Sequence, residues 1–280
     1  MLRKAALKLM EFRRSLSWIV AASTLAAAGC GGGGTGGGNQ PPAPVSDIGV
    51  SSSSSLGSYL VSSSGRTLYY FGVDLPGVGG AAPISNCEGS CLAIWPVFHV
   101  DSPSLAAGLS ASDFGELVRA DGSKQTTFKG WPLYLYVGDS RAGDTKGDNL
   151  NDFGPWYVIR DPFYSALVLS KAAGPSLYLA DPAGRTLYVS SQDTVGTANA
   201  APVSACDGAC LTNWPVFLAG SDAVPTGVDP SKLTTFTRAD GAMQSAFDGH
   251  PLYFFAGDNA PGDDNGRGVN GRDIVDPIHL

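Results

Sequence analysis

The sequence predicts an all-β protein made of two tandem antiparallel repeats that form one pseudo-symmetric body. Three observations lead to this expectation. The chain repeats itself at a fixed offset of 119 residues, each copy alternates short apolar runs with Gly, Pro and Asp, and no long apolar pattern of period 3.6 occurs. With 280 residues, of which 43% are hydrophobic, the chain can fill one large domain or two smaller ones.

The duplication is the strongest of these signals. Residues 59–147 align with residues 178–266 without a gap, and 39 of the 89 positions are identical. Self-similarity at a fixed offset indicates that the fold is built from repeated structural units. The predicted organisation is a signal peptide over 1–29, a lipidated cysteine and Gly/Pro/Ser-rich tether over 30–56, and β repeats over 57–163 and 174–280.

Within each copy, short runs read as strands separated by tight turns. Residues 176–180 and 185–189 flank an Asp-Pro-Ala-Gly turn, and residues 117–119 and 125–128 flank an Asp-Gly turn, as hairpins require. The one stretch that fits a short helix is 105–117.

A shorter pattern recurs four times, with a Tyr, any residue, an aromatic residue, two more residues and an Asp. Its third occurrence has Ser190 at the aromatic position. Four equivalent strand sets suggest a ring like a four-bladed propeller, and the alternative is two sandwich-like domains. The Tyr and Asp residues of the four segments are Tyr69 and Asp74, Tyr134 and Asp139, Tyr188 and Asp193, and Tyr253 and Asp258. We expect each Asp to end its strand in an Asx-turn.

The beginning of the chain has the features of an export signal. Five basic residues precede an apolar run of about 13 residues that ends in Ala27-Ala28-Gly29-Cys30, whereas a membrane span needs roughly 20. The last four residues resemble the lipobox of bacterial lipoproteins, with Ala27 in place of the usual Leu. Cys30 is the odd one of five cysteines and precedes a Gly-rich coil, so acylation would turn a lone thiol into an anchor. We therefore expect an exported lipoprotein held at the outer membrane or cell surface.

The other four cysteines form two Cys-x3-Cys pairs, and an even count in an exported protein predicts disulfides. The competing interpretation, a redox or soft-metal site, needs a further ligand such as His, and no His occupies the same place in both copies. The predicted local disulfides join Cys87 to Cys91 and Cys206 to Cys210.

Acidic loops follow two of the four Tyr…Asp segments and are weak candidates for calcium, which takes six to eight oxygen ligands. Neither loop has EF-hand spacing, and turn chemistry alone explains Asp beside Gly. The expectation is therefore no cofactor, with calcium as the alternative. The candidate ligands are Asp139, Asp144, Asp148, Asp258, Asp263 and Asp264. A second alternative is a stacking platform for a sugar or peptide, made by Trp131, Tyr134 and Tyr136.

Taken together, the lipobox-like start, the Tyr…Asp segments, Cys-x3-Cys followed by Trp-Pro, and Ala-Asp-Gly followed by Gly-x-Pro-Leu-Tyr resemble a bacterial family of secreted-repeat lipoproteins. The resemblance covers residues 57–270. It implies an exported, lipid-anchored protein and no assigned activity.

Three classes of function remain open. Without the signal, 13 basic and 24 acidic residues leave a net charge near −11, which argues against nucleic-acid binding. No nucleophile elbow, HExxH or phosphate loop is present, so we expect no enzyme. The leading expectation is a non-enzymatic binding or structural protein of the envelope, whose partner is an envelope protein or a glycan. The alternatives are a carbohydrate- or calcium-binding accessory module and a carboxylate-dependent hydrolase.

Overall fold

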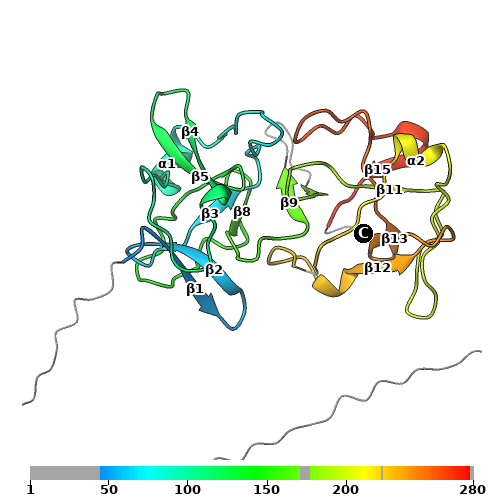
Figure 1. The fold of residues 1–280 in the computed structure, drawn as a ribbon, viewed down its shortest axis with the longest axis horizontal. Helices are drawn as coiled ribbons and strands as arrows, with labels where there is room; N and C mark the ends of the chain where they lie inside the picture. Colours follow the sequence, from blue (N-terminus) through cyan, green and yellow to red (C-terminus); the bar gives the residue numbers. More distant parts are fainter. Residues whose placement is uncertain (1–44, 171–176, 222, 278–280) are drawn as a thin grey trace, which may run out of the picture. The chain divides into compact units, whose positions relative to one another are not determined.

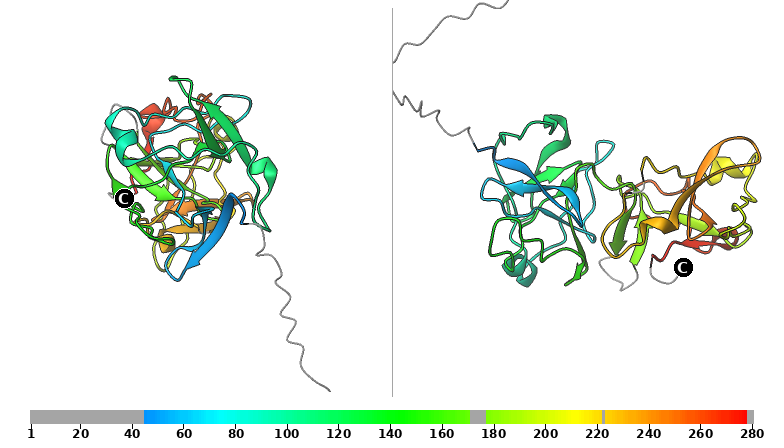
Figure 2. Two further views of the ribbon diagram at one scale, coloured as in Figure 1. Left: turned by 90° about the vertical axis from the view of Figure 1, so that its left-hand side faces the viewer. Right: turned by 90° about the horizontal axis from the view of Figure 1, so that it is seen from below.

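Small antiparallel sheets make up the fold (Figure 1). The computed structural model describes residues 45–170, 177–221 and 223–277, so the predicted signal peptide, Cys30 and most of the tether lie outside the described residues. Each sheet has two or three strands, no strand is shared between sheets, and Figure 2 gives two further views of the fold. The all-β class is confirmed, while no four-stranded propeller blade forms in the described part of the chain.

The two copies contain the same succession of elements except near their ends, where copy two has a 3-10 turn in place of a strand. Copy one has β1 (Ile48–Ser53), β2 (Gly57–Ser62), β3 (Tyr69–Phe71), α1 (Ser90–Ile94), the 3-10 turn η1 (Ala111–Asp113), β4 (Phe114–Val118), β5 (Lys124–Phe128), β6 (Trp131–Pro132), β7 (Leu150–Asn151) and β8 (Pro155–Val158). Copy two has β9 (Leu167–Ser170), β10 (Leu177–Ala180), β11 (Tyr188–Ser190), α2 (Cys210–Asn213), η2 (Pro230–Lys232), β12 (Leu233–Thr237), β13 (Met243–Phe247), β14 (His250–Pro251), η3 (Val269–Gly271) and β15 (Arg272–Ile274).

Each copy begins earlier than the predicted boundaries of 57 and 174. Strand β1 lies in the segment assigned to the tether, yet it pairs antiparallel with β2 and its Ile48 is fully buried. Strand β9 lies in the segment assigned to the connection between the copies, and it pairs with β10 in the same way. The sequence did not predict β1 because this serine-rich segment has too little apolar periodicity to indicate a strand.

The Asp-Gly hairpin is present in both copies as β4–β5 and β12–β13. The run 176–189 is less regular, because β10 joins the following segment through a single bridge between Ala180 and Thr186. The expected helix over 105–117 is only the 3-10 turn η1, whereas α1 and α2 follow the first cysteine of each pair. Helices of five and four residues are too short to show an apolar period.

The last strand of each copy pairs with the strand that carries its first Tyr…Asp segment. Tyr69 pairs with Val158 in copy one, and Tyr188 pairs with Ile274 in copy two. Val158 and Ile274 are therefore equivalent at an offset of 116 residues, whereas Tyr69 and Tyr188 are at 119. The loop before β15 is three residues shorter than the corresponding segment of copy one. Backbone bonds confirm this register, since the NH groups of Ile159 and Val275 bind the equivalent carbonyls of Leu68 and Leu187.

The hydrophobic core joins the two copies. Its largest cluster contains buried residues of both, and each copy also has its own smaller cluster around the Cys-x3-Cys loop. The indole NH of Trp131 in copy one donates to the carbonyl of Pro182 in copy two, over 2.9 Å. One body with internal pseudo-symmetry, as the sequence predicts, is the observed arrangement.

Candidate functional site

The Tyr…Asp segments of each copy pair with each other reciprocally. Tyr69 and Tyr134 face one another and exchange two backbone hydrogen bonds of 3.0 Å. The hydroxyl of Tyr69 donates to Asp139 over 2.7 Å, and the hydroxyl of Tyr134 donates to Asp74 over 2.7 Å. Each segment thus supplies a donor to the other segment's acceptor. Copy two repeats this arrangement with Tyr188 to Asp258 at 2.7 Å and Tyr253 to Asp193 at 2.8 Å.

The second oxygen of each carboxylate holds a distant loop. Asp74 accepts from the backbone NH of Asn86 at 2.6 Å, and Asp139 accepts from that of Lys146 at 2.9 Å. The expected Asx-turns are therefore replaced by longer-range bonds, which sequence spacing cannot reveal. Burial raises the pKa of Asp74 to about 7 and raises the pKa of Asp139 above its ordinary value. These buried groups serve the fold and are closed to a large substrate.

The aromatic residues next to these pairs are also buried. Trp156 stacks between Trp95, at 3.8 Å between ring centroids, and Phe71, at 4.1 Å. Trp131 and Tyr134 are fully buried, so the predicted stacking platform is wrong.

A buried arginine holds each Cys-x3-Cys loop. The Arg119 guanidinium donates to Gln125 over 2.8 Å, to the carbonyl of Cys87 over 2.6 Å, and to Ser85. Copy two has the same contacts, from Arg238 to Gln244 at 2.6 Å, Cys206 at 2.6 Å and Ser204 at 2.8 Å. The cysteines form the two predicted disulfides, with Cα–Cα distances of 5.4 Å for Cys87–Cys91 and 5.3 Å for Cys206–Cys210.

The carboxylates of the acidic loops bind their own backbone. Asp144 accepts from the NH groups of Ser140 and Arg141 and from the Lys146 ammonium, which together lower its pKa to about 2. Asp263 accepts from two NH groups in the equivalent loop, at 2.8 and 3.0 Å. Asp148, which is largely buried, accepts from the NH of Val158. A calcium role for these residues, and for Asp258 and Asp264, stays a prediction.

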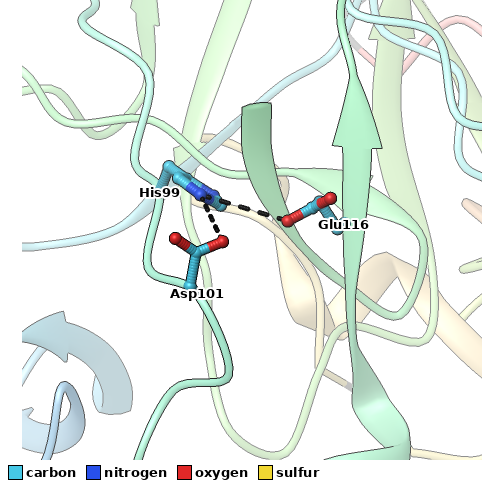
Figure 3. A group of neighbouring side chains, drawn as sticks. All are labelled: His99, Asp101 and Glu116. Atoms are coloured by element: carbon cyan, nitrogen blue, oxygen red, sulfur yellow. Dashed lines mark ion pairs between the residues drawn. The ribbon is translucent and has the colours of Figure 1, made fainter. Parts of the chain in front are cut away.

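One further cluster stands apart from the residues that the copies share. His99 Nε2 lies 3.3 Å from Asp101 Oδ1 and 4.0 Å from Glu116 Oε2, and one ligand atom from each residue lies within 4.8 Å of the others (Figure 3). Within residues 45–170, 177–221 and 223–277, this is the one group of three His, Cys, Asp or Glu side chains that meets this distance. The Lys124 ammonium lies 3.3 Å from Asp101 and 3.1 Å from Glu116.

Hydrogen bonds tie together the backbone segments that carry the cluster. Glu116 lies on β4 and Lys124 on β5, which are paired strands. The segment with His99 runs beside β5, because the NH of Thr126 donates to Phe98 and the Thr126 hydroxyl accepts from the NH of Val100. Copy two has the same backbone bonds, from Ser245 to Phe217 and from Ala219 to the hydroxyl of Ser245.

The side chains of the cluster nevertheless differ in copy two. At the equivalent positions stand Leu218, Gly220, Thr235 and Met243. The sequence comparison missed the cluster because it looked for chemistry at positions that both copies share. The differences between the copies could have indicated the cluster, because these four positions carry charged or ionisable residues in copy one and none in copy two.

Comparison with known proteins supports the repeat assignment. Residues 116–160 and 234–272 match the model of a family described as a secreted repeat of unknown function, one match in each copy. The resemblance seen in the sequence is thus confirmed in both copies. No curated protein and no solved structure matches this chain. In the part that the structure describes, no helix has both the length and the apolar character needed to cross a membrane.

Proposed function

We propose that this chain, which carries two copies of a secreted repeat of unknown function, is a lipid-anchored envelope protein that binds a partner and performs no catalysis. One observation carries the proposal. The Tyr–Asp pairs and the arginines under the disulfide loops, which both copies share, are buried or half-buried and bound to the fold itself. The repeat is therefore a scaffold, and its surface carries the features that distinguish one copy from the other.

The scaffold suits exposure outside the cell. In each copy a disulfide closes the Cys-x3-Cys loop, and disulfides persist in oxidising compartments. The predicted mature charge near −11 keeps such a surface away from nucleic acid and anionic lipid. This charge leaves a protein or another component of the envelope as the proposed partner, and the acyl group on Cys30 would keep the scaffold beside it.

Fractionation of cells tests the anchor. Cys30→Ala should move the protein from the membrane fraction to the soluble fraction, because the thiol that carries the lipid is absent. Ala27→Leu, which restores the usual lipobox residue, is the matched control and should leave the protein membrane-bound. Retention of the Cys30→Ala protein in the membrane would overturn the lipid anchor.

Crosslinking in intact cells tests the binding role. The wild type should yield a reproducible crosslinked partner that is mapped to surface lysines of the folded repeats. The Cys30→Ala protein, whose folded part is identical, should lose most of that crosslink because it leaves the membrane. If the wild type gives no crosslinked species while an abundant lipoprotein in the same cells does, the binding role is wrong.

A further inference from the structure

We propose that copy one holds a divalent transition-metal ion, of which Zn²⁺ is the representative, between His99, Asp101 and Glu116. This site goes beyond the proposed scaffold role and does not depend on the lipid anchor. Its ligands are one imidazole and two carboxylates, a set that Zn²⁺ accepts while leaving a coordination position for water.

The separations between the ligand atoms fit one ion. Metal–ligand bonds of about 2.0–2.2 Å place neighbouring ligand atoms of a tetrahedral site roughly 3.3–3.6 Å apart. His99 Nε2 and Asp101 Oδ1 are already at 3.3 Å, and His99 Nε2 and Glu116 Oε2 are at 4.0 Å. A rotation of the half-exposed Glu116 side chain closes this difference. Figure 3 shows the ion pairs that the imidazole makes with both carboxylates.

His99 lacks the hydrogen bonds that a structural histidine makes. Both ring nitrogens are shielded from solvent, and neither makes a hydrogen bond of good geometry. A shielded imidazole nitrogen without a partner is costly, and coordination of a metal satisfies one nitrogen directly. The Asp101 and Glu116 side chains are 76% and 40% exposed, so an ion can approach His99 from the side of the carboxylates.

The fold does not require this cluster. Copy two keeps the same backbone bonds around the site with Leu, Gly, Thr and Met at the four positions. All four side chains are present in copy one and none is present in copy two, which indicates that they have a common role outside the repeat fold. The repeat therefore folds without His99 and the charged residues around it.

Lys124 is the competitor for the site. Its ammonium bridges the two carboxylates, at 3.3 Å from Asp101 and 3.1 Å from Glu116. It is 48% exposed and its side chain is long, so it can turn into solvent when an ion enters. Because the ammonium neutralises the carboxylates in the absence of metal, its removal should strengthen metal binding.

Calorimetric titration with ZnCl₂ tests the proposal on tag-free, mature protein with intact disulfides. The wild type should bind one Zn²⁺ per chain. His99→Leu, which installs the residue of copy two, should weaken binding at least tenfold, and Lys124→Met, also taken from copy two, should strengthen it severalfold. Because copy two folds with both residues, neither variant is expected to unfold the protein, and circular dichroism verifies this.

Two controls separate the site from unspecific binding. His250→Asn changes the other described histidine, which lies in copy two, and should leave the stoichiometry and affinity unchanged. Mg²⁺ and Ca²⁺ should not compete at equal concentration, because an imidazole ligand favours transition metals. Absence of Zn²⁺ binding by the wild type, equal affinity of the His99→Leu protein, or no gain from Lys124→Met would each overturn the site.

Discussion

Arg272 lies over the indole ring of Trp214, with its guanidinium carbon 4.4 Å from the ring centroid. In copy one the equivalent contact is the stack of Trp156 on Trp95, at 3.8 Å. Copy two thus replaces an aromatic stack with a cation–π contact. The change extends to the neighbouring strand, because Ser190 stands where Phe71 covers the other face of Trp156.

Arg272→Ala should destabilise the protein by about 2 kcal/mol, because a buried cation–π contact is lost and a cavity opens beside Trp214. Arg272→Lys should recover little, since an ammonium lacks the flat guanidinium surface. Urea unfolding measures both. Arg267→Ala changes a half-exposed arginine nearby and should stay within about 0.5 kcal/mol of wild type. Equal stability of the Arg272→Ala protein would contradict the contact.

Removal of a motif hydroxyl should weaken each copy alike. Tyr69→Phe and Tyr188→Phe each leave an aspartate without its tyrosine donor, so each should lower the free energy of unfolding by about 1–3 kcal/mol. Tyr136→Phe is the control, because copy two already has Phe255 at that position. Chemical denaturation is the measurement, and a loss for Tyr136→Phe as large as that for Tyr69→Phe would contradict the special role of the pair.

Stability should fall as the pH rises from about 4 to about 7. Burial raises the pKa of Asp74 from 3.8 to about 7 in the folded state, so the folded protein keeps a proton that the unfolded chain has released. The favourable contribution is complete below pH 3.8 and disappears as the pH passes through 7. At about 1.4 kcal/mol for each pKa unit, the effect is on the order of 4 kcal/mol.

Asp74→Asn should flatten this pH dependence, because an amide does not titrate. Asp121→Asn is the control: hydrogen bonds from Ser123 lower the pKa of Asp121 from 3.8, so its contribution is lost only as the pH falls below about 4, and this variant should keep the wild-type slope between pH 4 and pH 8. Thermal unfolding between pH 4 and pH 8 measures the slopes. An unchanged slope in the Asp74→Asn protein would show that Asp74 does not cause it.

One ion pair is reversed between the copies. Asp113 binds Lys129 at 2.9 Å in copy one, and Lys232 binds Asp248 at 2.8 Å at the same positions in copy two. Asp113→Lys should therefore cost up to about 1 kcal/mol by placing two lysines together, and adding Lys129→Asp should restore stability. A double-mutant cycle by denaturant unfolding at low salt measures the coupling, and a coupling of zero would mean that the pair is incidental.

The sequence predicts what is local or duplicated. The hairpin formed by residues 114–128 follows from its Asp-Gly turn, and the disulfides follow from an even cysteine count at short spacing. The pairing of β3 with β8 could not be predicted in this way. It joins residues almost 90 positions apart, and no local pattern specifies which residues pair. The shift of three residues at β15 was hidden for the same reason.

The residues around the candidate site show a similar division. The Tyr and Asp of each segment were recognised as a motif, but their partners lie in the other segment and only the fold brings them together. His99 carried no motif, and its neighbour Glu116 is 17 positions away on another strand. Lone histidines are frequent in cores, so the sequence had no physical reason to select this one.

The reciprocal contact between the segments of Tyr69 and Tyr134 has the geometry of an isologous interface, in which the same patch meets itself across a twofold axis. Such a contact cannot be satisfied by one segment alone: a half-copy exposes an unmatched phenol and an unmatched carboxylate. The smallest self-sufficient unit of this chain therefore contains both segments. A fragment with one segment should need a second molecule of itself to complete the bonds, so it would dimerise or remain unfolded.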